Sequence, residues 1–585
     1  MLRTSLLVAL LCGCALQAAD IHVATSGNDT TGNGSIATPY ATLSRAHQAA
    51  SAGDKIIFRA GTYAGDFYVT KNNLTFESYP GEWARISVAN NVSGVDNALY
   101  IGTAANCTVR RLELEGGYYY AIKIDTGPCL VEDCVIHGSG RDCVKIPGVD
   151  NVTIRRCEIY DSGLRDPSNA EGIDNVNGDF MLVQDCYIHD IATNGVYPKG
   201  GSIGSIIERC LIRNCGQKGI SMAQSSGLQF YDTTANPEYY SCRDCIARNN
   251  IIENCEGSGI DLESALRAKV YNNTMINVAK SQQGGIRIAS ANKGGAAGTV
   301  KCKDCEIRNN IIVLGSASPR PMLFMGNASH EGTLTMSNNR YYKTGGTAVY
   351  WWEPTSYSLD LAGWKTTSGT DSNSTEGDPQ VGANWHLNGG SPCIDQATTI
   401  AGFNDDYDGN TRSGAWDIGA DETGGTALQT PPPAGTIGTG GGQAGAGTPA
   451  APSGFTATLN GADVDLSWTD NSGNETGFRI ERKVGTGSYA TVTTTAADAT
   501  SYTDTSAPAG ATVTYRVMAV NAGGAGLPSN EDSVVTPAGG GGGSGGSGGS
   551  SGGGGGCNAS PDAAFMCGIL ILGLITAVAP RGATD

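Results

Sequence analysis

Short segments in which apolar and polar positions alternate recur along most of residues 55–345, with glycine and asparagine turns between them. This alternation, with valine and isoleucine at the apolar positions, predicts short half-buried strands rather than helices. Each repeat carries a segment such as Val-Glu-Asp-Cys or Ile-Arg-Asn-Asn, whose last residues are Leu112, Cys134, Cys157, Cys186, Cys210, Asn250, Asn273, Asn310 and Asn339. Spacings of 22, 23, 29, 24, 40, 23, 37 and 29 residues indicate a coil of about 23 residues with loop insertions.

A coil of this length predicts a parallel β-helix, a stack in which each coil lies one strand spacing, ~4.8 Å, above the previous one. We assign residues 20–422 to a right-handed β-helix solenoid of this kind. Both ends of such a stack need a cover. Residues 41–52 have the apolar spacing of a short helix and fit an N-terminal cap, and an aromatic, aspartate-rich segment closes the other end.

Within the closing segment, Asp406, Asp408 and Asn410 alternate as the ligands of a calcium-binding loop do. The distant bidentate acid of such a loop is not evident. Because aspartate and asparagine side chains also stabilise turns by bonding to the backbone, we interpret these residues as turn-forming.

A second β segment follows a Gly/Pro-rich linker at 423–450. Residues 451–537 contain alternating strands at 463–468, 477–482, 489–492 and 512–520. With Trp468 and Tyr515 among them, this segment resembles a fibronectin type III module, which implies a β-sandwich with Trp468 in its core. The chain is therefore predicted to be all-β, a solenoid followed by a fibronectin type III-like sandwich.

The two ends of the chain have the patterns of export signals. Residues 1–19 combine an early arginine, an apolar run and small residues, as a secretory signal peptide does, and Cys14 lies in a segment that resembles a bacterial lipobox. At the other end a Gly/Ser linker at 538–556 precedes a cysteine, a short apolar stretch and an arginine at 557–585. This tail resembles bacterial C-terminal sorting signals, with an ordinary membrane anchor as the alternative. Both interpretations predict a secreted or bacterial cell-surface protein.

Charge and composition narrow the function classes. Acidic residues outnumber basic ones by 56 to 38, and a formal net charge of −18 excludes a general nucleic-acid binder, which needs a basic field. The six histidines are scattered along the chain and form no dense metal-binding motif. Contact with a membrane is expected only through the C-terminal tail or a lipid at Cys14, and we expect a monomer.

The cysteines follow the repeat. Two of the 18 lie in the signal segment and two in the tail, and most of the other 14 fall on repeat positions, with Cys134, Cys157, Cys186 and Cys210 in one column. Neighbouring coils bring such residues to disulfide distance, so the cysteines can stack as free thiols or form bridges such as Cys215 to Cys255. An exported protein meets an oxidising environment, which favours bridges. The pairs Cys242-x-x-Cys245 and Cys302-x-x-Cys305 offer a zinc site as the alternative.

Polar residues also form a predicted column. When the strands before each repeat position are aligned by their glycines, alternation sends one polar residue per coil outward on a single face. These residues are Lys123, Lys145, Asp174, Tyr197, Ser221, Asp261 and Arg287, with Lys199 and Glu263 two positions further along their strands. A continuous groove of this kind suits a linear polymer, because each sugar ring advances about as far as one coil.

The opening segment 22–29, with 38–42 and 52–63, is similar to the start of family 9 polysaccharide lyases. The resemblance implies β-elimination of polyuronates with a lysine base and calcium held by aspartates. It assigns the base to Lys199, in the glycine-flanked segment 194–201, and calcium to Glu171 and Asp174. The sequence departs from the family in two ways: paired adjacent aspartates are missing, and Pro198 is expected to shift or bulge the strand before Lys199.

The chemistry of elimination gives each residue a role. A base removes the proton α to a carboxylate while cations neutralise that carboxylate, so Lys145 and Arg287 would bind the uronate and Lys123, Tyr197 and Asp261 would line the chain. We expect Asp174 and Lys199 roughly 8 Å apart, which leaves room for a sugar carboxylate. The predicted function is a polyuronate lyase acting on acidic polysaccharide, and the alternative is a non-catalytic glycan-binding or adhesin-like surface protein.

Overall fold

The computed structural model describes residues 18–537, apart from 224–225, 296, 383, 425–448, 450–451, 473–474, 476, 486–488, 522–523 and 526–527. Residues 1–17 of the predicted signal peptide, most of the 423–450 linker, and the predicted Gly/Ser linker and tail from 538 onward lie outside the described residues. Among the helices that are described, none has the length and apolar character needed to cross a membrane.

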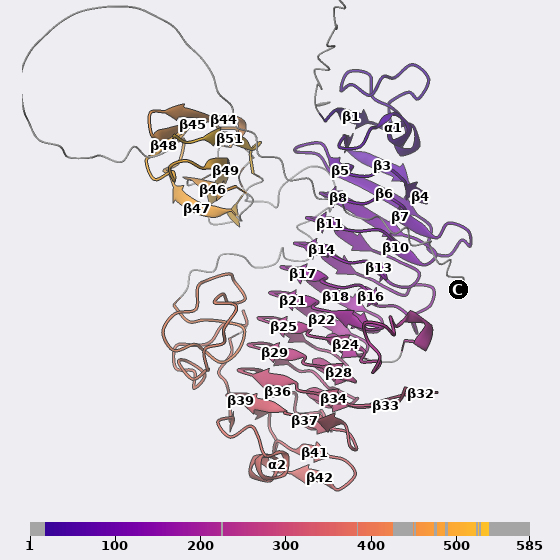
Figure 1. Ribbon diagram of the computed structural model, residues 1–585, viewed down its shortest axis with the longest axis vertical. Helices are drawn as coiled ribbons and strands as arrows, with labels where there is room; N and C mark the ends of the chain where they lie inside the picture. The colour runs from indigo at the N-terminus through magenta and orange to yellow at the C-terminus, as the bar shows by residue number, and fades with distance from the viewer. Residues whose placement is uncertain are drawn as a thin grey trace, which may run out of the picture.

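Three sheets of twelve strands each run side by side along one stack (Figure 1). Strands of the first sheet, in order, are β1 (Asp20–Val23), β2 (Lys55–Phe58), β5 (Thr75–Ser78), β8 (Cys107–Arg110), β11 (Cys129–Glu132), β14 (Val152–Arg155), β17 (Leu182–Gln184), β21 (Ile206–Glu208), β25 (Ile246–Arg248), β29 (Lys269–Tyr271), β35 (Glu306–Arg308) and β39 (Thr335–Ser337). Each strand pairs in parallel with the strand one coil away, as Asp20 does with Lys55. The predicted parallel β-helix is therefore confirmed.

The second sheet carries the predicted polar residues. Its strands are β4 (Phe67–Val69), β7 (Asn97–Ile101), β10 (Tyr120–Ile124), β13 (Val144–Pro147), β16 (Ile173–Val176), β19 (Val196–Lys199), β23 (Ile220–Ala223), β27 (Ile260–Glu263), β31 (Ile286–Ala289), β37 (Leu323–Met325), β41 (Tyr350–Trp352) and β42 (Ser356–Leu359). Pro198 pairs in register with Asn175, and Lys199 pairs with Val176. The strand is continuous at this point, so the expected bulge before Lys199 was wrong: a parallel ladder can accept a proline where the missing N–H is not needed.

The third sheet completes each coil. Its strands are β3 (Gly61–Ala64), β6 (Ala84–Val88), β9 (Leu112–Gly116), β12 (Val135–His137), β15 (Glu158–Tyr160), β18 (Tyr187–Ile191), β22 (Leu211–Cys215), β26 (Ile251–Glu253), β30 (Thr274–Ile276), β36 (Ile311–Leu314), β40 (Arg340–Lys343) and β43 (Thr375–Glu376). Isoleucine, valine and leucine from all three sheets fill the interior as one continuous buried core. Helix α1 (Leu43–Ala49) lies over the first coils and buries Leu43, Ala46 and His47.

One interior turn position changes its residue type along the stack. It is cysteine from Cys134 to Cys210 and asparagine from Asn250 to Asn339. The asparagines form a hydrogen-bonded ladder, in which Nδ2 of Asn250 donates to Oδ1 of Asn273 at 3.0 Å, and Nδ2 of Asn273 donates to Asn310 at 3.0 Å.

The fourteen cysteines of the described chain are all buried free thiols, which corrects the expectation of bridges. Their sulfurs bond to backbone carbonyls instead, as Cys157 does to Arg155 at 3.3 Å.

The zinc alternative also fails within the described residues. No three cysteine sulfurs there come close enough together to bind one ion. Cys242 and Cys302 lie on strands β24 (Cys242–Arg243) and β34 (Cys302–Lys303) of an additional small sheet, and β28 (Ala265–Leu266) separates these strands. Cys245 and Cys305 lie just before β25 and β35 of the first sheet.

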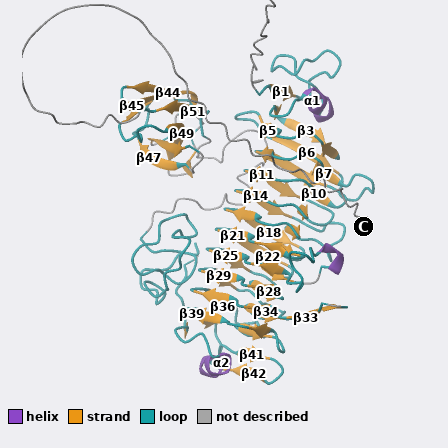
Figure 2. Ribbon diagram, viewed as in Figure 1, coloured by secondary structure: helices purple, strands orange, loops and turns teal. Residues whose placement is uncertain are grey.

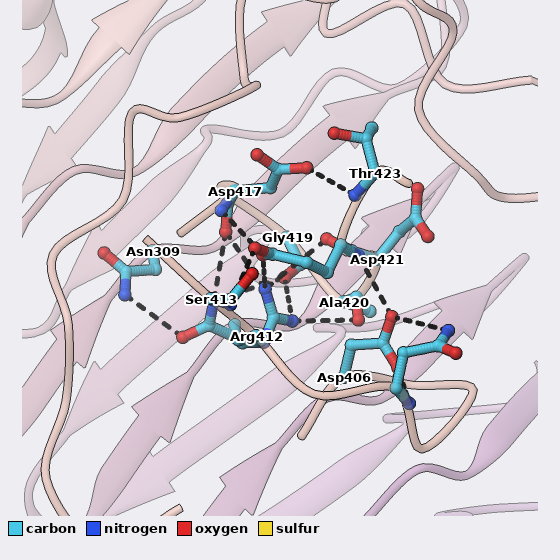
Figure 3. Close-up of polar contacts among 12 residues, drawn as sticks. Asn309, Asp406, Arg412, Ser413, Asp417, Gly419, Ala420, Asp421 and Thr423 are labelled. Carbon is cyan, nitrogen blue, oxygen red and sulfur yellow. Dashed lines mark hydrogen bonds and ion pairs between the residues drawn. The ribbon is translucent and has the colours of Figure 1, made fainter. Parts of the chain in front are cut away.

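Residues 378–423, which we call the strap, fold back along the outside of the stack after helix α2 (Leu361–Ser368) (Figure 2). Arg412 holds the strap against the stack, and its side chain is fully buried. Its guanidinium donates to Asn249 Oδ1 of the stack at 3.1 Å and pairs with Glu422 Oε2 at 3.2 Å. It also donates to the strap carbonyls of Gly419 and Ala420 (Figure 3). Asp406 Oδ1 accepts the backbone N–H of Asn410 at 2.7 Å, as the turn interpretation requires.

Residues 453–535 form two antiparallel sheets around a separate core. One contains β44 (Ser453–Asn460), β45 (Asp463–Thr469) and β48 (Ser501–Asp504), and the other contains β46 (Gly477–Val484), β47 (Ala490–Thr494), β49 (Thr512–Asn521), β50 (Gly524–Ala525) and β51 (Asp532–Val535). Trp468 is 5% exposed in this core, so it packs as predicted. The assignment of this segment as fibronectin type III-like stays a prediction.

Candidate functional site

The outward positions of the second sheet form one registered line, which we call the column. From N- to C-terminal coils its members are Tyr68, Tyr100, Lys123, Lys145, Asp174, Tyr197, Ser221, Asp261, Arg287, Phe324 and Trp351. All the residues predicted to share this face therefore do so. The sequence did not predict that aromatic pairs would extend the column at both ends.

Asp174 lies at the centre of the column and is fully buried. The ammonium of Lys145 bonds to its Oδ2, and Lys199 Nζ lies 3.0 Å from its Oδ1. Burial on its own would raise the pKa of Asp174, but the two ammonium groups outweigh burial and lower the pKa below its usual value. Asp174 and Lys199 stand one coil and two strand positions apart, as predicted. Their side chains nevertheless meet directly, so the expected room for a sugar carboxylate between them was wrong, because the Lys199 side chain reaches back over the coil before it.

Three carboxylates gather beside these lysines. Oxygen atoms of Asp142, Glu171 and Asp174 all lie within 4.8 Å of one another, and all three residues are buried. Lys145 Nζ is 3.5 Å from Asp142 Oδ2, yet burial raises the pKa of Asp142 well above its usual value. Asp142 was missed by the sequence analysis, although it stands three residues before Lys145 as Glu171 stands before Asp174.

Calcium is the group that the resemblance implies for this cluster. Glu171 Oε2 and Asn194 Oδ1 are buried and lack a hydrogen-bond partner among the described residues. These oxygens, with Asp142 and Asp174, make an all-oxygen donor set, which is the set Ca²⁺ prefers. The residues present therefore fit the ion, and calcium at Glu171 and Asp174 stays a prediction to which Asp142 is added.

The other predicted residues are engaged with close neighbours. Lys123 Nζ pairs with Asp125 at 2.9 Å, and Arg287 Nη1 lies 3.0 Å from Asp261 and 2.8 Å from Glu263. Lys199 Nζ also stands 4.1 Å from the centre of the Tyr197 ring, a cation–π contact. Each of these cations is therefore paired with an acid, and the column is not a row of free cations.

A further lysine near Glu263 was missed because it lies on a hairpin outside the repeat. Lys293, on β32 (Ala291–Gly294), donates to Tyr231 Oη at 2.8 Å and to Ser241 Oγ at 2.6 Å. Burial lowers the pKa of Lys293 to about 8, and Glu263 opposes that shift only in part. Lys293, with neutral hydroxyl partners, is therefore closer to giving up its proton near neutral pH than Lys145, whose pKa the neighbouring acids raise.

Comparison with known proteins identifies the fold. Residues 97–237 and 230–361 match a family described as right handed beta helix region. The chain contains a right-handed parallel β-helix. No curated protein matches the chain.

Several solved structures are similar to parts of the chain. Pectate lyase Pel9A is 15% identical, with a TM-score of 0.43, over 70% of this chain and 97% of that chain. The A-module of mannuronan C-5 epimerase AlgE6 from Azotobacter vinelandii is 13% identical, with a TM-score of 0.43, over 61% of this chain and 89% of that chain. An Fn3-like protein from Clostridium thermocellum is 31% identical over 15% of this chain and 91% of that chain, with a TM-score of 0.14.

Proposed function

We propose that this chain is an exported cell-surface protein that acts on acidic polysaccharide as a polyuronate lyase. The observation that carries the proposal is the meeting of Lys145 and Lys199 at one buried carboxylate, Asp174, inside a column that presents one side chain per coil. A linear polymer laid along the column meets a new side chain about every 4.8 Å, close to the length of one sugar unit.

Local cations explain why an acidic chain would hold an acidic polymer. The net charge of −18 repels polyanions, so binding needs positive groups at the contact. Lys123, Lys145, Lys199 and Arg287 supply them from four different coils of the second sheet when a uronate carboxylate replaces the acid with which each one pairs. Tyr197 and Asp261 add a ring and a hydrogen-bond acceptor to the same line.

In the proposed reaction, Lys199 removes the proton from the carbon α to the uronate carboxylate. The C–H electron pair forms the new C=C bond, the adjacent C–O glycosidic bond breaks, and the leaving oxygen takes up a proton from solvent. Lys145 binds that carboxylate and stabilises its developing charge, and Arg287, five strands further along the sheet, binds the carboxylate of another sugar unit of the polymer. Since Lys199 must act as a free amine, its ion pair with Asp174 opens when the polymer binds. Calcium, held by Asp142, Glu171 and Asp174, would supply additional positive charge to the uronate.

The test is to incubate the secreted chain with pectate and with alginate and to follow the absorbance of the unsaturated product. We expect Lys199→Ala to lower the rate by about 10²-fold or more. Lys280→Ala, at an exposed pair with Glu256, is the matched control and should leave the rate unchanged. No product from any polyuronate, or full activity in Lys199→Ala, would show that the lyase proposal is wrong.

Glycan binding without turnover is the second candidate, and the aromatic ends of the column favour it. Tyr68 and Tyr100 stand 4.7 Å apart at one end, and Phe324 and Trp351 stand 6.2 Å apart at the other. Aromatic faces pack against the apolar face of sugar rings. The test is retention of the chain on a polyuronate gel without formation of product. Loss of retention in Trp351→Ala would support this function instead, provided that Phe180→Ala, at an exposed site off the column, is retained.

A further inference from the structure

The strap contains a second cluster of metal-binding side chains, outside the stack and its column. A hollow of about 410 Å³ is lined by His386, Asp408, Asn410 and Asp421 among others. His386 Nε2 lies 2.5 Å from Asp408 Oδ2 and 3.9 Å from Asp421 Oδ1. One imidazole nitrogen and two carboxylate oxygens therefore lie within 4.8 Å of one another.

Neighbouring acids of the strap have structural partners. Glu422 pairs with Arg412, and Asp417 accepts the backbone N–H of Thr423 (Figure 3) and that of Asp395. Asp421 accepts the backbone N–H of Leu387 through Oδ2 at 2.7 Å, and its Oδ1 is the oxygen nearer to His386. Among the described residues, His386 is the cation that pairs with Asp408 and Asp421. The Asp408 side chain is 1% exposed, and its Oδ1 has no hydrogen-bond partner in the described part of the chain.

An unpartnered carboxylate oxygen in a buried position costs free energy unless a ligand satisfies it. Asp408 lines the hollow, so a ligand in the hollow can reach that oxygen. A metal ion displaces the proton that joins His386 Nε2 to Asp408, so two carboxylates and an imidazole then provide two negative charges and one neutral nitrogen, which together attract a divalent cation rather than an anion. An imidazole ligand favours a transition metal over calcium or magnesium.

We propose that His386, Asp408 and Asp421 bind one divalent transition-metal ion, such as Zn²⁺ or Mn²⁺, in the strap. Metal–ligand distances of about 2.0–2.2 Å place neighbouring ligand atoms roughly 3–3.4 Å apart. Binding therefore moves His386 Nε2 and Asp408 Oδ2 slightly apart from 2.5 Å and brings Asp421 Oδ1 closer from 3.9 Å. The volume of the hollow leaves room for water to complete the coordination. Because the three residues come from separate turns of the strap, the ion ties its start, middle and end together and holds it against the third sheet.

The experiment uses the full chain after treatment with EDTA and dialysis. Isothermal titration with Zn²⁺ and with Mn²⁺ should show one equivalent bound, and thermal unfolding should move to higher temperature when the metal is present. We expect His386→Gln to weaken binding at least about tenfold, the loss of one of three ligands being worth more than about 1.4 kcal/mol. His330→Gln, which changes another largely buried histidine outside the strap, should bind as the wild type does.

Two further measurements keep the proposal testable if a variant does not fold. Electron paramagnetic resonance of the wild type loaded with one equivalent of Cu²⁺ should show a single nitrogen ligand. Glu171→Gln, which changes the carboxylate cluster of the column without removing an ion pair, should retain the ion and so separates the strap from that cluster. Absence of stoichiometric binding, binding unchanged in His386→Gln, or binding lost in Glu171→Gln would each overturn the proposal.

Discussion

Lys199 Nζ lies 3.0 Å from Oδ1 of Asp174, although the two residues stand on neighbouring coils and 25 positions apart in sequence. Lys145, one coil on the other side, holds the second oxygen of the same carboxylate. A buried acid between two lysines is thus balanced from both directions along the stack. The same three residues therefore stabilise three successive coils and form the proposed site.

Asp174→Asn should destabilise the β-helix strongly. The substitution leaves the mostly buried ammonium groups of Lys145 and Lys199 without their shared carboxylate. Removing one partner of a buried ion pair costs about 3–5 kcal/mol. The free energy of unfolding from urea titration measures this. Asp244→Asn, whose pair with Arg267 is solvent-exposed, should cost less than about 1 kcal/mol. Equal costs for the two variants would contradict the central role of Asp174.

Lys293 should react with amine-directed reagents at lower pH than other lysines. Burial lowers its pKa to about 8, so half of its side chains carry no proton at that pH. Mass spectrometry of acetylated peptides across pH 6–11 gives the titration of each lysine, with the exposed Lys280 as reference. If Lys293 and Lys280 titrate together, the hydroxyl environment of Lys293 does not favour the free amine.

The same lysine can be tested for a part in turnover. If the chain is a lyase, Lys293→Met and Lys199→Met compare the two amines directly. Lys199→Met should remove activity, as the proposed mechanism requires. Loss of activity in Lys293→Met with an unchanged Lys199→Met would instead assign the base to the hairpin.

His189 should stabilise the fold more in weak acid than in base. Burial opposes its charge, but the hydrogen bonds that the imidazolium donates to Glu158 and Asp190 outweigh burial and raise the pKa of His189. A raised folded-state pKa gives stability that is fully present below the unfolded value of 6.5 and is lost as pH rises through the folded value. Relative to wild type, His189→Gln should therefore lose about 1–2 kcal/mol at pH 5.5 and less at pH 9.

The stacking of His189 provides an internal check on that result. Its ring lies between Tyr160 and Tyr187, with ring centres at 5.0 and 4.1 Å. Loss of stacking is independent of pH, whereas loss of the charged hydrogen bonds is not. A cost for His189→Gln that stays the same from pH 5.5 to pH 9 would assign the whole effect to packing.

The interior ladder predicts which substitutions the turn position accepts. Asn273 donates to two carbonyls and to Asn310, so Asn273→Leu leaves several buried polar groups unsatisfied and should cost about 3 kcal/mol or more. Asn250 follows Cys210 in the stack, and Asn250→Cys extends the thiol column by one coil. We expect this variant to lose less than half as much. The free energy of unfolding in urea compares the two variants. An equal loss would show that a thiol cannot take the place of an asparagine at this position.

The β-helix and the column could be predicted from the sequence because both depend on local periods. Alternation of period two fixes which side of a strand each residue faces, and a coil of about 23 residues fixes which residues are neighbours on successive coils. Lys145, Asp174 and Tyr197 are in register for these two reasons alone.

Contacts that cross the repeat could not be predicted in this way. Asp142 enters the carboxylate cluster from a turn, Lys293 comes from a hairpin inserted between coils, and Arg412 returns from a strap to reach Asn249. Insertions and straps have no fixed period, so their path depends on which surfaces they can bury and which polar groups they can satisfy. The sequence by itself determined the stack and the order of charges along it. Only the tertiary structure decided that those charges neutralise one another and that a histidine–aspartate cluster forms outside the stack. The first depends on the direction in which each side chain turns from its coil, and the second depends on contacts between segments with no periodic relation.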